Sequence, residues 1–128
     1  STNLPMGSSP LIGTNTGTDL DGFIASFDGT NGAFVDATYL GTSSYDQAFI
    51  LDIDLDGDIY TIGQSKGNYP IFNAAYSNAN GSQFIHKFNP NLSTTIFSTK
   101  IGIGKATVDI SPTAFLVDDC ENVYVSGW

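Results

Sequence analysis

Apolar residues occur along this chain in short runs that end at polar turn residues. Two such runs, Phe23 to Phe27 and Phe34 to Leu40, flank the segment 28–32, which reads Asp-Gly-Thr-Asn-Gly. Asn and Gly accept positive φ, so a segment of this kind closes a hairpin. Short apolar runs bounded by turn residues are typical of β-strands, and the sequence has no convincing long amphipathic helix. The pattern therefore predicts an all-β fold built from hairpins.

The same pattern continues to the end of the chain and predicts eight strands in four hairpins. The turns are Gly- or Asn-rich and contain Asp-Gly or Asn-Pro pairs, which interrupt strand pairing and reverse the chain. The predicted strands are Phe23 to Phe27, Phe34 to Leu40, Ala48 to Ile53, Ile59 to Ile62, Phe84 to Phe88, Thr95 to Ile101, Ala114 to Val117 and Val123 to Ser126.

The sequence also repeats itself once. Positions 21–41 return at one constant spacing, and positions 54–63 return at a slightly longer one, which a single insertion after Gly102 explains. The matched residues are Phe23, Phe27 and Gly41 with Phe84, Phe88 and Gly102, and Asp54, Asp58, Tyr60 and Gly63 with Asp118, Asn122, Tyr124 and Gly127.

A repeat of this length indicates one supersecondary unit used twice, because such units bury their apolar faces only by stacking. We expect one segment over residues 1–128, with repeat units at approximately 19–64 and 81–128 joined by the loop 65–80. Two hairpins per unit predict four-stranded antiparallel sheets packed face to face.

Composition narrows the class of partner. The apolar fraction of 41% is enough for a core, and the net charge is −9 with no Arg. An acidic chain is a poor partner for nucleic acid or an anionic membrane, and cations suit it better. No run approaches the roughly 18 apolar residues of a membrane span. The first five residues lack the charge and apolar core of a signal peptide, so we expect a mature or excised chain.

Three stretches together resemble a known family. They are Asp21-Gly22-Phe23-Ile24-Ala25-Ser26-Phe27, then Thr38-Tyr39-Leu40-Gly41, then Asp54-Leu55-Asp56-Gly57-Asp58-Ile59-Tyr60-Thr61-Ile62-Gly63. This order is similar to the SBBP-type bacterial β-propeller repeat, and the segment 122–127 is the closer match to the end of that repeat. The chain departs from the pattern at Thr42, where a second Gly is common, and at the segment 118–121, which lacks the Gly of the turn.

The resemblance implies a β-propeller segment of four-stranded antiparallel blades, about two repeats long. It also implies how the strands are grouped: the strands at 48–53 and 59–62 begin a blade, and those at 84–88 and 95–101 finish it. The chain would then hold the outer half of one blade, one whole blade and the inner half of a third. Proteins with such repeats are typically large, secreted or exposed at the bacterial cell surface, and some resemble adhesion proteins.

One turn carries a candidate metal site. Asp52, Asp54, Asp56 and Asp58 alternate around Gly57, a spacing that resembles calcium loops in which oxygen ligands at alternate positions wrap a Ca²⁺. The late acidic ligand of such loops is missing. We therefore expect no cofactor other than this possible calcium ion.

The alternative interpretation of this turn is an Asp-Gly hairpin turn with solvated carboxylates. The second copy favours it, because Cys120 and Glu121 stand in the corresponding turn. Cys120 is the only cysteine, which excludes an intrachain disulfide, and a turn position is a simpler role for it than that of a nucleophile. His86 has no second His, and we expect it on the surface of its strand.

The aromatic residues suggest a core and a loop site. Eight phenylalanines fall within predicted strands and are expected to pack between blades; they are Phe23, Phe27, Phe34, Phe49, Phe84, Phe88, Phe97 and Phe115. Tyr69, Pro70 and Phe72 instead lie in the long connection between the units. Long loops on a rigid scaffold often carry binding surfaces, so Tyr69 and Phe72 form a possible binding loop. The alternative is a loop that its own apolar residues fold over the sheet edge.

These observations predict a non-catalytic structural or interaction module of an extracellular or cell-surface bacterial protein, related to adhesion. Its partners would be a protein or glycan ligand, and the other blades of a longer chain or further copies of itself in a ring. One alternative is part of a propeller enzyme that acts on glycans, with an active site in the central channel drawn from several blades. A second alternative is a calcium-dependent adhesin, which rests on residues 52–58 alone.

Overall fold

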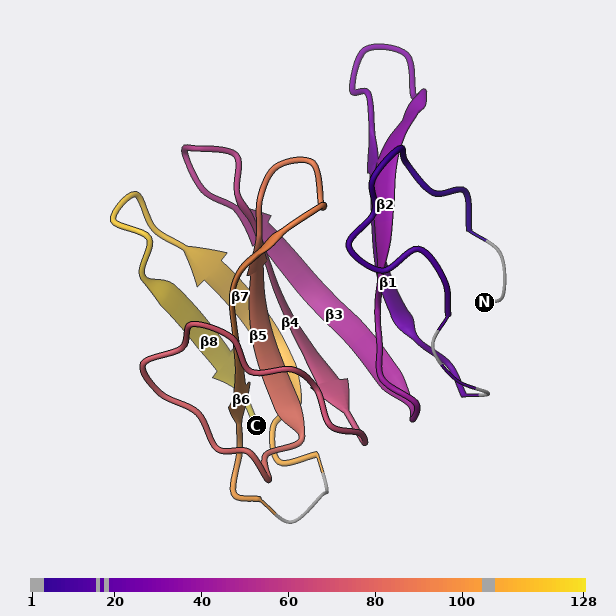
Figure 1. Ribbon diagram of the computed structural model, residues 1–128. Helices are drawn as coiled ribbons and strands as arrows, with labels where there is room; N and C mark the ends of the chain where they lie inside the picture. Colours follow the sequence, from indigo (N-terminus) through magenta and orange to yellow (C-terminus); the bar gives the residue numbers. More distant parts are fainter. Residues whose placement is uncertain (1–3, 16, 18, 105–107) are drawn as a thin grey trace.

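The computed structural model describes residues 4–15, 17, 19–104 and 108–128. The described residues form strands and no helix, and thus none long and apolar enough to cross a membrane. The strands are β1 (Gly22–Phe27), β2 (Phe34–Leu40), β3 (Asp46–Ile53), β4 (Ile59–Ser65), β5 (Gln83–Phe88), β6 (Thr95–Ile101), β7 (Pro112–Val117) and β8 (Val123–Gly127) (Figure 1). The prediction of an all-β, antiparallel protein is confirmed.

The strands form three antiparallel sheets. The central sheet has the order β3-β4-β5-β6, and the hairpins β1-β2 and β7-β8 form two-stranded sheets on either side of it along the chain (Figure 1). The four strands that the family resemblance grouped into one sheet do pair with one another, whereas the expectation of one four-stranded sheet within each repeat unit is wrong. The central sheet takes two strands from each of the expected units 19–64 and 81–128, so the sheet boundaries cut across the sequence units.

The hairpins β1-β2 and β5-β6 share one pairing register. Gly22 pairs with Leu40 in the first hairpin, and Gln83 pairs with Ile101 in the second, which are corresponding positions of the sequence repeat. In both hairpins the register shifts just before the last residue of the first strand. β-Bulges bend and twist a strand, so the two hairpins have the same shape as well as the same pairing.

The hairpins β3-β4 and β7-β8 agree in the same way. Ala48 pairs with Gly63, and Pro112 pairs with Gly127, again at corresponding positions of the repeat. In each hairpin the register shift comes directly after this pair. The sequence repeat is therefore also a structural repeat of two kinds of hairpin.

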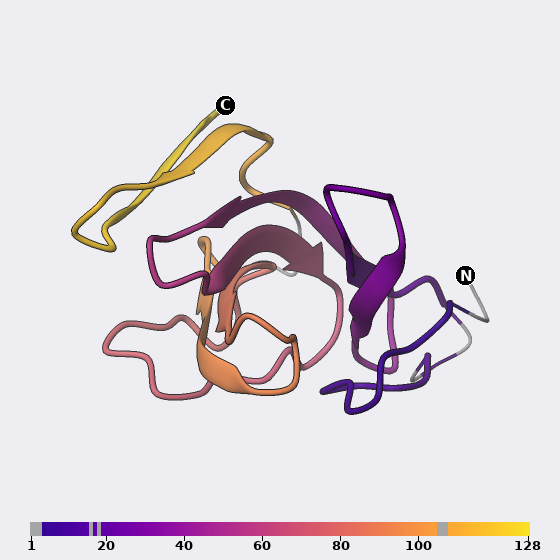
Figure 2. The ribbon, with the colours of Figure 1, turned by 90° about the horizontal axis from the view of Figure 1, so that it is seen from above.

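The two small sheets pack on different core clusters of the central sheet. One cluster joins β1-β2 to the central sheet and contains Ile24, Leu40, Ile59, Phe88 and Leu92, with Ala48 against it. The other joins β7-β8 to it and contains Tyr60, Ile62, Phe115 and Val117, with Ile50, Ile85, Phe97 and Val123 against it. Seen from above, the β7-β8 hairpin and the β1-β2 hairpin flank the central sheet (Figure 2). The result is a stack of three layers.

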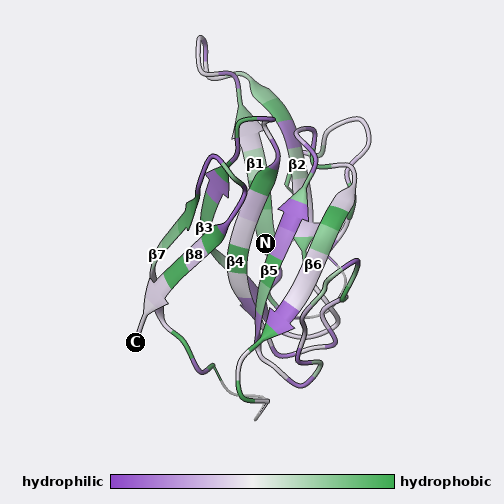
Figure 3. Cartoon of the chain, turned by 90° about the vertical axis from the view of Figure 1, so that its left-hand side faces the viewer, coloured by the Kyte–Doolittle hydropathy of each residue, from purple (hydrophilic) through white to green (hydrophobic). Residues whose placement is uncertain are grey.

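The phenylalanines divide between core and surface. Phe84, Phe88 and Phe115 are buried, as the sequence predicted. Phe23, Phe27 and Phe49 are exposed, and the expectation that they belong to the core is wrong for this chain. The first two lie on β1, whose second edge no described strand covers, and the third lies at the bulge of β3. Apolar segments are accordingly visible on the strands of the outer hairpins as well as in the middle (Figure 3).

The long connection between β4 and β5 follows the outer edge of β6. Phe72 and Ser98 exchange two backbone hydrogen bonds, each with an N to O distance of 2.9 Å. The Ser98 hydroxyl donates to the carbonyl of Pro70 at 2.8 Å, and the Asn78 backbone N–H donates to the carbonyl of Lys100 at 2.8 Å. The connection therefore covers much of an edge that would otherwise present unpaired backbone groups.

Candidate functional site

The Asp-rich turn joins β3 to β4 and is organised by one carboxylate. Asp54 Oδ1 accepts hydrogen bonds from the backbone N–H groups of Asp56 at 3.1 Å and Asp58 at 2.9 Å. This arrangement is an Asx turn, in which a short acidic side chain replaces a backbone acceptor. Gly57 completes the reversal with φ of 85°, a conformation that side chains with a Cβ disfavour. The sequence pattern around Gly57 thus first of all specifies the turn.

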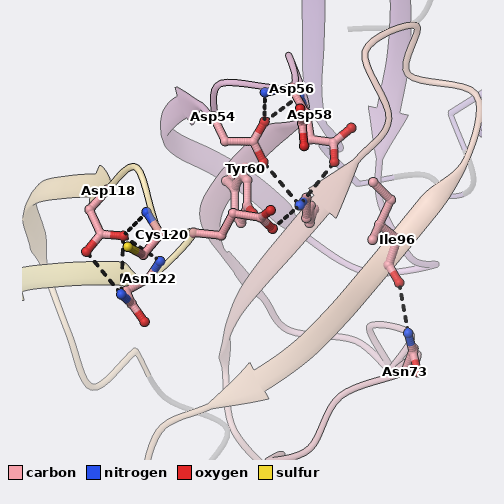
Figure 4. A network of polar contacts seen from close by, with 11 residues as sticks. Asp54, Asp56, Asp58, Tyr60, Asn73, Ile96, Asp118, Cys120 and Asn122 are labelled. Atoms are coloured by element: carbon pink, nitrogen blue, oxygen red, sulfur yellow. Dashed lines mark hydrogen bonds and ion pairs between the residues drawn. The ribbon is translucent and has the colours of Figure 1, made fainter.

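The four aspartates of this turn do not converge on one point. Asp52 Oδ2 accepts the backbone N–H of Val117 at 2.8 Å, which ties β3 to β7. Asp54 and Asp58 face inward, and Asp56 is exposed (Figure 4). The inward carboxylates meet the ammonium group of Lys87, at 3.1 Å from Asp54 and 3.0 Å from Asp58.

Lys87 lies on β5 and is the centre of this cluster. Its Nζ also lies 2.7 Å from Glu121 Oε2, contributed by the turn between β7 and β8, and 4.8 Å from the centre of the Tyr60 ring. Burial alone would lower the pKa of Lys87, but its bonds to these groups outweigh burial and hold that pKa above its usual range. A buried ammonium held in this way stays charged, as its acidic partners require.

The partners of Lys87 show the matching shifts. Burial would raise the pKa of Asp54, but the hydrogen bond to Lys87 keeps it below its usual value. Lys87 likewise lowers the pKa of Glu121. Tyr60 donates its hydroxyl to Glu121 Oε2 at 3.2 Å, and burial raises the pKa of Tyr60 to about 12. The cluster is therefore a network of fixed charges near neutral pH.

Calcium binding at this turn is not tested by the structure and remains a prediction. Among the described residues, no group of three or more His, Cys, Asp or Glu side chains is arranged to hold a metal ion. Lys87 occupies the space between Asp54 and Asp58 that a cation would use. A calcium ion at this turn would have to displace the ammonium group first.

The corresponding turn between β7 and β8 has the same backbone geometry, but among the described residues no lysine bonds to its aspartate. Asp118 Oδ1 accepts from the backbone N–H groups of Cys120 at 2.9 Å and Asn122 at 2.8 Å. Tyr124 donates its hydroxyl to Asp118 Oδ2 at 3.0 Å. Bonds from Asn122 lower the pKa of Asp118. Cys120 is exposed in this turn. Glu121 takes φ of 63° where the other turn has Gly57, so the missing glycine does not change the turn.

Tyr69 of the possible binding loop belongs to the core. Its ring stacks on Phe84 with centroids 3.8 Å apart, and its hydroxyl lies 2.8 Å from His86 Nδ1. His86 is buried, and its other nitrogen lies 2.9 Å from Thr95 Oγ1. The expectation of a surface histidine is therefore wrong, because β4 and β6 flank β5 and Tyr69 closes over it. Burial lowers the pKa of His86 to about 3, so the ring is neutral.

Phe72, in contrast, is exposed while its backbone is bound to β6. Beside it the connection and β6 line an open hollow of about 350 Å³, whose wall includes Tyr76, Phe97 and Ile101. The structure thus separates the two residues of the predicted loop site. Tyr69 fixes the loop to the sheet, and Phe72 remains available on the outside.

A second acidic group lies between β1 and β3. Asp46 Oδ2 accepts from the backbone N–H of Thr42 at 2.6 Å and from its hydroxyl at 2.8 Å. Burial raises the pKa of Asp46. Asp46 lines, with Asp21 and Tyr45, a hollow of about 390 Å³. Raised carboxyl pKa values occur at catalytic sites. The hydrogen bonds from Thr42 to Asp46 give this carboxylate a structural role, because they fix the loop 42–46 in front of β3.

Sequence reasoning missed Lys87, Glu121 and Asp46. A signal for Lys87 was present, since a lysine inside an apolar strand is unusual in a chain in which Lys and Arg together number only 4. Its acidic partners lie far from it along the chain, two in an earlier turn and one in a later turn. Only the pairing of β4 with β5 and the packing of β7-β8 bring them together.

A comparison of this chain with models of protein families, with curated proteins and with solved structures found no match in any of the three. The site must therefore be interpreted from its own geometry.

Proposed function

We propose that this chain is a segment of a β-propeller that serves as a non-catalytic structural or interaction module of an extracellular or cell-surface protein. The observation that supports it best is the order of the sheets. A complete four-stranded antiparallel sheet is flanked by two hairpins, and each hairpin repeats the register of one half of that sheet. Such a series is what a stack of equal blades requires.

The position of each hairpin supports the same proposal. The hairpin β1-β2 has the register of the outer half of the central sheet, and β7-β8 has that of the inner half. The two hairpins belong to separate core clusters of the central sheet. Face-to-face packing of twisted sheets in one direction curves into a ring, which closes after about four to eight blades.

A non-catalytic role is supported by the way in which the reactive side chains are used. His86 is neutral and enclosed by Tyr69, Phe88 and Thr95. Lys87 and its acidic partners bind one another. The exposed positions with binding character are apolar, such as Phe72 beside its hollow. A protein or glycan surface is the ligand class that such a face suits. The extracellular, bacterial location rests on the SBBP-type resemblance.

The propeller is tested with three or four copies of this chain joined head to tail in one polypeptide. We expect electron microscopy to show ring-shaped particles with a central channel, because each copy supplies two blades' worth of strands. Open rods would contradict a propeller. The matched control is the same polypeptide with Phe88→Ala in every copy, which removes a core residue of the central sheet and should lose the ring.

The extracellular location and the non-catalytic role are tested next, the location on bacteria that carry the gene for this chain. An antibody against the folded chain should label intact cells or their medium, and a cytoplasmic marker should be labelled only after permeabilisation. A panel of polysaccharides incubated with the ring-forming polypeptide should release no reducing ends. Release of reducing ends, abolished by a substitution in the channel, would instead support the glycan enzyme.

A further inference from the structure

The strands β8 and β1 each have an edge that pairs with no strand among the described residues. β8 pairs only with β7, and β1 pairs only with β2. The central sheet shows what belongs at these edges, because β4, the equivalent of β8, pairs with β5, the equivalent of β1. The chain therefore contains the pattern for a contact between its own two ends.

The β4-β5 register transfers directly to the free edges. Tyr60 pairs with Lys87, and Gly63 pairs with Phe84. Replacing each residue by its equivalent in the sequence repeat pairs β8 with β1 in the same antiparallel direction. The resulting pairs are Val123 with Phe27, Tyr124 with Ser26, Val125 with Ala25, Ser126 with Ile24, Gly127 with Phe23 and Trp128 with Gly22.

The side chains fit this register at a glycine. In the central sheet a Cβ on Gly63 would come within 2.3 Å of the Phe84 ring, so the phenylalanine lies directly over the glycine. The transferred pair is Gly127 and Phe23, again a glycine and a phenylalanine. Phe23 is 48% exposed in this chain, and Trp128 on the other edge is 86% exposed. Pairing would cover apolar surface on both sides.

The charges fit as well. Lys87 neutralises Asp54 and Asp58 in the central sheet. Its equivalent on β1 is Ser26, which is uncharged, and the equivalent of Asp58 is Asn122. Asp118 is already satisfied by its own turn and by Tyr124. The turn beside the free edge of β8 therefore has no second inward carboxylate, and its Asp118 needs no lysine from the neighbouring strand. This suits pairing with β1, which offers Ser26 where β5 offers Lys87.

We propose that β8 binds β1 of a second copy of this chain in this register, which forms a composite four-stranded sheet β7-β8-β1-β2 at each junction. The contact is heterologous, so it leaves one free edge at each end of a dimer and closes only in a ring. Three or four copies would supply six to eight sheets. The inference rests on the proposed function. It adds to that function a way for the propeller ring to close, which is the assembly of separate chains.

Light scattering on the 128-residue chain tests the proposal. The measurement needs about 0.15 M salt, so that the net charge of −9 on each copy is screened. We expect a discrete trimer or tetramer. Phe23→Ser should weaken association at least tenfold, whereas Val35→Ser, an exposed apolar position on β2 away from the junction, should leave it unchanged. A folded monomer at every concentration would overturn the proposal and assign the edges to strands of a longer polypeptide.

Disulfide trapping tests the register itself. On a Cys120→Ser background, chains with Ala25→Cys are mixed with chains carrying Val125→Cys, the residue opposite in the transferred register. Opposite residues in antiparallel strands have Cα atoms about 4.5 to 5.5 Å apart, which suits a disulfide. The control partner carries Val123→Cys, on the same face of β8 but out of register. Efficient cross-linking only with Val125→Cys is expected, and equal yields with both partners would contradict the register. The light scattering and disulfide tests both use separate chains. If they fail, copies joined in one polypeptide can still form a ring, so the failure contradicts self-association but not the proposed propeller.

Discussion

Equivalent residues of the central sheet and of the flanking hairpins have opposite environments. Phe88 is 0% exposed and its equivalent Phe27 is 62% exposed; Tyr60 is 1% exposed and Tyr124 is 54% exposed. The backbone registers are the same in both places. Local sequence thus determines the strand, the bulge and the turn, but the presence of a neighbouring strand determines what is buried.

The two Asx turns make the same point with charges. Both use one aspartate to accept two backbone N–H groups, and both place a residue at positive φ in the same position. Among the described residues, only in the turn beside β5 does a lysine contact the aspartate that organises the turn, since Lys87 reaches the other turn through Glu121. The turn beside the free edge satisfies its aspartate with Asn122 and Tyr124 instead. The polar residues of each of the two turns therefore match the side chains that lie beside that turn.

The largest expected effect comes from removing equivalent phenylalanines. Phe88→Ala should lower the free energy of unfolding by about 3 to 5 kcal/mol, because it leaves a cavity in a closed core. Phe27→Ala and Phe49→Ala, at positions that are exposed in the single chain, should each cost less than about 1 kcal/mol when the protein is dilute enough to be monomeric. Urea unfolding of the three variants measures the difference. Equal losses at Phe88 and Phe27 would mean that β1 is covered in solution, as pairing with a second copy would require.

Lys87→Met should have the next largest effect. It leaves the inward carboxylates of Asp54 and Asp58 without their cation, and breaking a buried ion pair costs about 3 kcal/mol. Lys66→Met is the matched control, since Lys66 is exposed and should cost less than about 0.5 kcal/mol. The same urea unfolding at pH 7 compares them. A loss at Lys87 no larger than the control would show that the cluster is solvated.

His86 should make stability depend on pH in a known direction. Its pKa is about 3 in the folded protein against 6.5 for the free side chain. Between these values the unfolded chain binds a proton that the folded chain does not, so stability falls as pH falls below 6.5. The expected loss at pH 5 is about 2 kcal/mol. His86→Gln should flatten this dependence between pH 7 and pH 5, a range in which few carboxylates titrate. An unchanged slope in the variant would place the titrating group elsewhere.

Gly57→Ala should have a smaller effect, of about 1 kcal/mol, because φ of 85° disfavours a Cβ. Gly29→Ala is the control, since a Cβ at Gly29 meets nothing within 4 Å and its φ is not positive. Thermal unfolding is sensitive enough for this comparison. A cost at Gly57 as small as at Gly29 would mean that the turn relaxes freely.

Much of the fold was predictable because its determinants are local. Short apolar runs and turn residues predicted the eight strands, but the repeat spacing did not group them correctly, because each expected unit contributes only two strands to the central sheet; the correct grouping came from the resemblance to the SBBP-type repeat. Burial was less predictable, since Phe23 and Phe84 have matching sequences around them and differ only in their neighbours. The environments of His86 and Lys87 depend on Tyr69 and Glu121, which reach them through tertiary packing and not through strand alternation.

Calcium is expected to have the smallest effect, and its size depends on Lys87. A calcium ion held by Asp54 and Asp58 must displace the ammonium group that lies 3.1 and 3.0 Å from them. Stabilisation is about 0.4 kcal/mol when free Ca²⁺ equals its Kd, which is about 1 to 2 °C in Tm. We expect millimolar Ca²⁺ to give such a rise in Lys87→Met and a smaller one in the unsubstituted chain.

The control for calcium is Asp56→Asn in the Lys87→Met background, measured against EDTA by thermal unfolding. Asp56 is exposed and makes no ion pair with Lys87, so Asp56→Asn removes one candidate calcium ligand without disturbing the turn, and it should reduce the rise if Asp56 joins Asp54 and Asp58 at the ion. A rise as large in the unsubstituted chain as in Lys87→Met would show that calcium binds away from the lysine. No rise in either protein would assign the aspartates to the turn and the ion pairs alone.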